Sequence, residues 1–98
     1  MSAYIVVSAT VNDEDRFQKE YIPQTIETIS RYEGRVLVAE DNPEVAEGRF
    51  PGSRVVIVEF PDREKLDNWY SSDEYKPLMK IRKDIASSNV LFANAFSQ

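Results

Sequence analysis

Residues 54–75 read RVVIVEFPDREKLDNWYSSDEY, and this stretch decides the fold. Its first seven residues, Arg54–Phe60, are mostly β-branched or aromatic and have the length of a strand. Pro61 ends the strand, because proline has no N–H to give to a sheet ladder. Asp62 follows as a helix N-cap, with a side-chain oxygen that can accept a bond from the first turn. The stretch therefore predicts a strand that turns directly into a helix.

The helix after Asp62 has an apolar face made of Leu66, Trp69 and Tyr70. Ser71 and Glu74 then have the S-x-x-E spacing of a capping box, which is typical of a new helix start. Apolar residues continue at helical spacing as far as Ile85. We therefore expect a second short helix after a stop near Ser71.

Three further strands and one further helical region are predicted outside this stretch. Pro23 lies inside the helical region, so we expect a kink or restart there. Gly34 follows the same region and is expected to end it as a left-handed cap. The predicted strands are Ala3–Val11, Arg35–Ala39 and Val90–Phe96, and the helical region is Asp13–Tyr32.

The predicted order is β-α-β-β-α-β, which is the plan of the split β-α-β, or ferredoxin-like, fold. The fold class is α+β, with a four-stranded antiparallel sheet and helices on one face. The 98 residues are enough for one hydrophobic core. We therefore expect residues 1–98 to form a single domain.

Both faces of the predicted sheet are apolar, although helices can cover only one of them. In the strand Arg54–Phe60, the set of Val56, Val58 and Phe60 lies opposite Val55 and Ile57. A sheet face exposed to water should instead alternate apolar and polar residues. A second copy, packed sheet against sheet, is the simplest cover for such a face. The pattern therefore predicts a homodimer.

Composition excludes several classes of function. The net charge of −5 disfavours nucleic acid and anionic membranes as partners. The chain has no cysteine and no histidine, which excludes disulfides, thiolate catalysis and imidazole chemistry. We expect no metal and no cofactor, since nucleotide-binding glycine motifs are also absent. Met1–Val7 lacks a basic lead and is predicted to be a strand and not a signal peptide. The absence of cysteine favours a cytoplasmic protein.

The chain resembles domain-of-unknown-function family 1330 of the dimeric α/β-barrel superfamily. The residues that carry the resemblance are Gly34–Val38, Glu47-Gly48, Arg54–Pro61, Trp69–Tyr75 and Arg82. The resemblance implies a ferredoxin-like protomer in a back-to-back dimer, and it implies no particular activity. Relatives in the superfamily include cofactor-free monooxygenases, isomerases, haem-dependent enzymes and ligand sensors. Several of them use a pocket histidine, which this chain lacks.

Glu59 is the candidate catalytic residue. It ends an apolar strand on the face that carries Val55 and Ile57. Burial there would either raise its pKa, as a general base requires, or pair it with Arg54, Arg35 or a tyrosine hydroxyl. Both readings remain open at this stage.

The candidate ligand-binding residues are aromatic, basic and amide side chains near the ends of elements. An arginine offers a bidentate fork to a carboxylate or phosphate, and aromatic rings can wall a pocket. Each also has an ordinary structural reading, as core packing, a solvated charge or an ion pair. The candidates are Trp69, Tyr75, Arg82, Arg54, Glu47 and Asn94.

Two functions fit these residues. The first is a dimer that binds a small organic or anionic molecule between sheet and helices, including as a cofactor-independent enzyme. The alternative is a non-catalytic interaction or scaffold module, which predicts a filled core, no pocket and no perturbed carboxylate. The sequence does not decide whether the protein is an enzyme.

Overall fold

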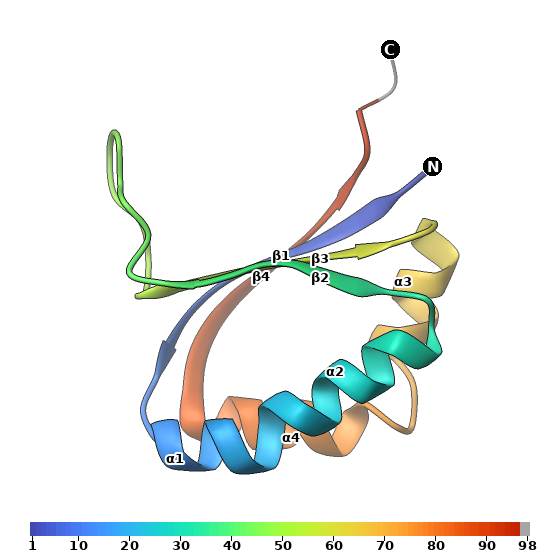
Figure 1. The fold of residues 1–98 in the computed structure, drawn as a ribbon, viewed down its shortest axis with the longest axis horizontal. Helices are drawn as coiled ribbons and strands as arrows, with labels where there is room; N and C mark the ends of the chain where they lie inside the picture. Colours follow the sequence, from blue (N-terminus) through green and yellow to red (C-terminus); the bar gives the residue numbers. More distant parts are fainter. Residues whose placement is uncertain (97–98) are drawn as a thin grey trace.

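A four-stranded antiparallel sheet with helices packed on one face forms the structure (Figure 1). The structure, a computed structural model, describes residues 1–96. The strand order is β2-β3-β1-β4, and the predicted β-α-β-β-α-β plan is confirmed. The elements are β1 (Ala3–Val11), α1 (Glu14–Arg16), the π-helical η1 (Phe17–Tyr21), α2 (Ile22–Arg31), β2 (Arg35–Asp41), β3 (Arg54–Phe60), α3 (Arg63–Tyr70), α4 (Lys76–Ile85) and β4 (Ala86–Asn94).

The two faces of the sheet have different surroundings. In Figure 1, α1, α2 and α4 lie on one side, while the green connection between β2 and β3 rises on the other side. We call these the helix face and the open face. The core lies on the helix face and includes the side chains of Ile5, Val58, Phe60, Leu66, Trp69 and Tyr75.

The first helical region restarts at Pro23, as predicted. The chain widens into the π-turn η1 just before the proline, and α2 begins one residue before it. Because Pro23 has no N–H, the carbonyl of Lys19 loses its usual helical donor. The side-chain amide of Gln24 donates to this carbonyl instead, at 3.4 Å.

The end of α2 corrects the prediction for Gly34. Glu33, not Gly34, takes the left-handed conformation, with φ of 63°. The N–H of Gly34 bonds to the carbonyl of Ile29 and that of Glu33 to Ser30, which is the Schellman pattern of helix termination. Glycine is required at position 34 for space, since a Cβ would lie 2.7 Å from the Phe60 ring and 2.8 Å from the Ile29 side chain.

The predicted capping box at Ser71 is wrong by one residue. Ser72 caps the turn before α4, where its Oγ accepts a bond from the N–H of Tyr75 at 3.1 Å. The Ser71 hydroxyl donates back to the carbonyl of Asp67. Glu74 does not close the box, because its carboxylate accepts hydrogen bonds from Arg31 and Tyr32 instead.

The last strand begins four residues earlier than predicted. β4 pairs with β1 from Ala86 onward, opposite Val11, and ends at Asn94. This pairing brings Ser88 into the sheet beside Ala9. The strand Ala3–Val11 and the strand Arg54–Phe60 have the predicted bounds, while β2 extends two residues further, to Asp41.

The open face carries apolar side chains from three strands. Val6 lies opposite Ile57 on β3 and Leu91 on β4, and Val55 faces the same way two residues before Ile57. The Leu91 side chain is 63% exposed in the single chain. The apolar patterning of both faces is therefore present as predicted. None of the described helices is long and apolar enough to cross a membrane.

Candidate functional site

A cavity of about 300 Å³ lies between the helix face of the sheet and the helices. Residues from η1, α2, α3, α4 and all four strands line it, and most of these side chains are apolar. Its volume is at the lower end of the range for small-molecule sites. The cavity is therefore the natural place to look for a ligand site.

The floor of the cavity changes from polar to apolar along the strands. One row across β3, β1 and β4 consists of Arg54, Ala9 and Ser88. The next row facing the same way is Val56, Val7 and Val90, and the one after it contains Val58 and Ile5. Because alternate residues share a face, these rows lie one behind the other on the floor. The polar groups of the floor are thus confined to the end where β3 begins.

Aromatic rings form the wall toward α3 and α4. The Trp69 ring lies 5.6 Å from the Phe60 ring and 4.1 Å from the Tyr75 ring, measured between centroids. Tyr70 packs edge-on against Phe92, at 5.0 Å. Such contacts stabilise the packing of the rings beyond their burial alone.

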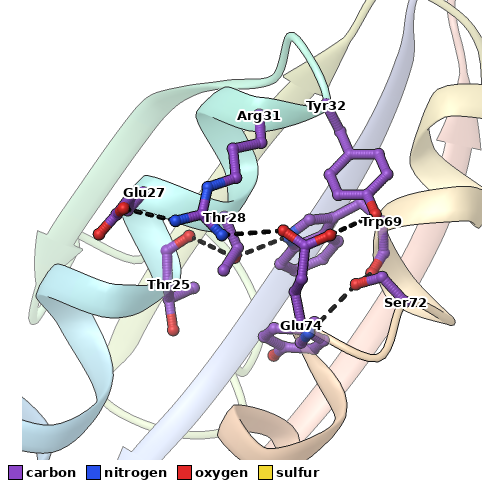
Figure 2. A network of polar contacts seen from close by, with 9 residues as sticks. Thr25, Glu27, Thr28, Arg31, Tyr32, Trp69, Ser72 and Glu74 are labelled. Atoms are coloured by element: carbon purple, nitrogen blue, oxygen red, sulfur yellow. Dashed lines mark hydrogen bonds and ion pairs between the residues drawn. The ribbon is translucent and has the colours of Figure 1, made fainter.

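Polar contacts fix Trp69 against α2 (Figure 2). The indole Nε1–H donates to the Thr28 hydroxyl at 3.0 Å, and that hydroxyl donates to the carbonyl of Thr25. Figure 2 also shows Glu74 between Arg31 and Tyr32, which both donate to its carboxylate. These bonds join the end of α2 to the turn between α3 and α4, and so hold the two sides of the cavity together.

Two tyrosine hydroxyls meet inside the cavity. The oxygens of Tyr21 and Tyr75 lie 2.6 Å apart, so one hydroxyl donates to the other. Burial raises the pKa of both phenols above the ordinary value. Both side chains are therefore neutral at physiological pH, and the pair supplies hydroxyl groups and no negative charge.

Arg82 is a buried cation without a carboxylate partner. Its residue surface is only 7% exposed, and its Nε–H has no hydrogen-bond acceptor within residues 1–96. None of the ion pairs in this part of the chain includes it. A buried charge of this kind is costly unless something balances it.

Arg54, the second arginine of the cavity, is balanced. Its Nε and Nη2 contact the carboxylates of Asp41 and Glu14, and its guanidinium lies over the Phe17 ring, 4.6 Å from the centroid. The hydrogen bond and charge of Arg54 lower the pKa of Asp41. Asp41 is the single carboxylate that lines the cavity within residues 1–96, and this ion pair already holds it.

The buried side-chain polar atoms that lack a partner gather at this cavity. Within the described residues there are four such atoms, and every one belongs to a residue of the lining. Native proteins satisfy nearly all buried polar groups, so a cluster of exceptions needs a reason. The four atoms are Thr25 Oγ1, Arg54 Nη1, Arg82 Nε and Ser88 Oγ.

The structure brings four of the predicted site residues together and leaves three outside. Trp69, Tyr75, Arg82 and Arg54 all line the cavity. Glu47 lies in the connection between β2 and β3, where it is exposed to solvent and which Figure 1 shows on the open side of the sheet. Asn94 is exposed at the far end of β4 and does not line the cavity.

Glu59 lies on the open face and not in the cavity, which corrects the expectation of a buried, base-like carboxylate. Arg35 Nε donates to it at 2.9 Å and the Tyr4 hydroxyl at 3.2 Å. Hydrogen bonds from the side chains of Ser2 and Arg35 lower the pKa of Glu59. A base at neutral pH needs the opposite shift. The paired reading of this residue is the one that the geometry fits.

Sequence reasoning missed Tyr21, Thr25 and Ser88 as site residues. Tyr21 has the spacing of a core residue on its helix, and nothing in the sequence marks its hydroxyl as the partner of Tyr75. Ser88 lies before the predicted start of the last strand. A predicted strand that began at residue 86 would have placed Ser88 beside Ala9 and on the same face as Val90. That strand start is the signal that could have identified Ser88 as a site residue.

The arrangement can donate hydrogen bonds and stabilise negative charge, and it has little capacity to remove a proton. Its donors are hydroxyl and guanidinium groups, and its one carboxylate is paired. Within residues 1–96 no group of three or more acidic side chains is placed to hold a metal ion. The chemistry available in the cavity is therefore recognition of polar or anionic atoms.

Solved structures of other proteins share the fold at low identity. The chain matches RPA0582, a protein of unknown function from Rhodopseudomonas palustris, with a TM-score of 0.77 and 13% identity over 99% of this chain and 84% of that one. It matches SnoaB, a cofactor-independent oxygenase from Streptomyces nogalater, with a TM-score of 0.65 and 13% identity over 99% and 95% of the two chains. A putative antibiotic biosynthesis monooxygenase from Bacteriodes thetaiotaomicron gives 0.56 and 20% over 97% and 89%.

No curated protein matches the chain. A family model does match, over residues 2–96, which is nearly the whole length. The family's description is "Domain of unknown function (DUF1330)". On the strength of this match and of the ferredoxin-like fold, the chain belongs to the DUF1330 family.

Proposed function

We propose that this protein binds a small organic molecule in the cavity between the helix face of the sheet and the helices. The observation that carries the proposal is that the four unpaired buried polar atoms of residues 1–96 all belong to residues that line one apolar cavity. Each such atom costs free energy in the folded protein, and a bound molecule with matching groups removes that cost. A cavity of about 300 Å³ supports this proposal over the scaffold alternative, which predicts a filled core.

The same geometry favours recognition over a reaction that begins with proton abstraction by Glu59. That carboxylate is on the other face of the sheet and has a lowered pKa. SnoaB is a cofactor-independent oxygenase, and a related activity here would need a substrate that ionises without a protein carboxylate. Arg82 and the tyrosine hydroxyls would then stabilise the anion.

The proposal includes a homodimer formed through the open face. Val6, Val55, Ile57 and Leu91 form an apolar surface there that the helices of the same chain do not cover. A second copy would bury this surface against its own equivalent. Light scattering should give a mass of about twice 11.3 kDa, and Leu91→Lys should shift the protein toward monomer. A wild type that is monomeric at micromolar concentration would refute the dimer.

A filling substitution tests the cavity. Val90 lies in the middle row of the floor, and Val90→Phe places a ring in the cavity. We expect calorimetry with the neutral bicyclic probe 7-methoxycoumarin to show one site per chain in the wild type and none in Val90→Phe. Lys80→Phe adds the same ring at an exposed position of α4 and should bind normally. Unchanged binding by Val90→Phe would place the probe elsewhere and refute the proposed site.

A further inference from the structure

Arg82 gives the cavity an unbalanced positive charge. The charged and titratable side chains around it are Tyr21, Tyr70 and Tyr75. Tyr21 and Tyr75 are neutral phenols, since burial raises their pKa values. The one carboxylate that the described lining contains, Asp41, is held by Arg54. Within residues 1–96 the fold thus buries a guanidinium with aromatic hydroxyls around it and no anion beside it.

This absence of a partner is unusual for the molecule. The other arginines that approach the core, such as Arg54, form ion pairs with carboxylates from neighbouring elements. A buried cation without an anion weakens a fold and is retained where it serves binding or catalysis. Arg82 therefore has the position and the free donor of an anion-binding group.

The remaining unpaired donors define the rest of the ligand. Arg54 Nη1 and Ser88 Oγ flank Ala9 in the polar row of the floor, and the rows behind them contain only aliphatic side chains. Because Arg54 is already neutralised, its free N–H suits an uncharged acceptor, such as a carbonyl or hydroxyl oxygen. The cavity is thus polar at one end and apolar at the other.

From these observations we propose that the ligand is an organic monoanion, an enolate, phenolate or carboxylate, with a polar head that carries a second, uncharged oxygen and with an apolar body. Arg82 holds the anionic oxygen, the row of Arg54 and Ser88 faces the polar head, and Trp69 and the aliphatic rows enclose the body. The inference rests on the proposed function, since it names the class of molecule that the same cavity takes.

The test uses two coumarins that differ in charge and share a bicyclic body. 7-Hydroxycoumarin ionises to a phenolate with a distinct absorption band, and 7-methoxycoumarin stays neutral. When bound to the wild type, the hydroxyl probe should ionise about 1 pH unit or more below its free value, because a nearby cation favours the anion. The methoxy probe should bind without any such change.

Arg82→Met should remove this shift and weaken phenolate binding by at least about tenfold, as expected for a charge-assisted hydrogen bond. Binding of 7-methoxycoumarin should change by less than about twofold, a change too small to count as a lost contact. Arg63→Met is the matched control, because it removes one arginine charge from an exposed helical position outside the cavity. It should leave both probes unaffected.

Stability separates a binding role from a structural one. A buried cation that has a Tyr70 hydrogen bond but no carboxylate partner in residues 1–96 contributes little to folding, so ligand-free Arg82→Met should melt at the wild-type temperature or above it. A clear loss of thermal stability would show that Arg82 is a structural residue and would overturn the inference. A bound hydroxyl probe that ionises at its free pH, or above it, would also overturn it.

The outcomes for the two proposals are distinct. If 7-methoxycoumarin binds the wild type and Val90→Phe prevents it, the cavity is a binding site whatever its preferred charge. If only the phenolate shift is missing, the ligand class is wrong and the proposed function stands. If neither probe binds, the proposed function itself fails.

Discussion

Gly34→Ala tests the packing at the junction between α2 and β2. The added Cβ would lie 2.7 Å from Cε1 and 3.0 Å from Cδ1 of Phe60, and 2.8 Å from Cγ2 of Ile29. Carbon atoms in good contact are about 3.5–4.0 Å apart, so something must move by nearly 1 Å. Phe60 is completely buried and Ile29 is nearly so, and neither can swing into solvent.

The expected cost follows from this overlap. Insertion of one methyl into a well-packed core typically lowers the free energy of unfolding by about 1–3 kcal/mol. For a domain of this length that corresponds to roughly 4–8 °C of melting temperature per kcal/mol. We expect Gly34→Ala to fall in this range, although φ at residue 34 is not in the left-handed region.

Glu33→Gly is the control. It places a glycine at the residue with the left-handed backbone, whereas Gly34→Ala removes the glycine from the position that lacks space for a Cβ. At Glu33 a glycine relieves a left-handed backbone worth about 1–2 kcal/mol. It also loses about 0.5–1 kcal/mol in chain entropy, together with a solvent-exposed ion pair to Lys65, which contributes little. The sum is close to zero. The sequence-based reading of Gly34 as the left-handed residue does not explain this pair of outcomes.

Urea unfolding at one fixed protein concentration measures both variants, since the proposed dimer would make the midpoint depend on concentration. The fluorescence of Trp69, the one tryptophan of the chain, reports on the packed wall. Far-ultraviolet circular dichroism reports on the helices. A Gly34→Ala protein within about 0.5 kcal/mol of wild type, the scatter of neutral surface changes, would refute the steric argument.

Two further predictions concern the hydrogen bonds around the cavity. Tyr75→Phe leaves the Tyr21 hydroxyl without its 2.6 Å partner, at a cost of about 1–3 kcal/mol. The double variant with Tyr21→Phe should recover part of this loss in urea unfolding, and strict additivity would show that the pair is not coupled. Hydrogen bonds from Arg31 and Tyr32 lower the pKa of Glu74 below 4.5. The stability that it contributes is thus present above pH 4.5 and is lost as the pH falls through the lower folded value. Glu74→Gln should therefore melt below the wild type at pH 7 and converge with it in acid; parallel melting curves against pH would contradict this.

The sequence pattern predicted element bounds correctly where the local residues alone favour one type of secondary structure. β1 and β3 have the predicted bounds because β-branched runs and a terminating proline or polar segment define them. The start of β4 was missed because residues 86–89 read ASSN and contain no β-branched or aromatic residue. These residues are a strand because β1 supplies their partners, from Val11 to Ser8. Such pairing depends on contacts between distant parts of the chain.

For the candidate site, too, local pattern predicted some features, and others depend on how the chain packs. The period of two in β3 placed Glu59 with Val55 and Ile57 on one face, and this is what the structure shows. Strand period does not say which face the helices cover, so the sequence could not tell whether Glu59 enters the cavity. Arg82 was found because it follows a buried helical stripe. Its missing partner emerged only from the packed structure.

Glu59 and Arg82 differ in how the fold balances their charges. Each is a charged residue among apolar neighbours, and the chain supplies Glu59 with Arg35 and Tyr4 as partners. Asp84, two residues further along α4, does not face Arg82 and instead contacts Arg16. A domain with a total stability of about 5–15 kcal/mol cannot retain an unpaired buried cation without consequence. An anion from outside the chain is the partner that would balance it, and the cavity beside it provides the space.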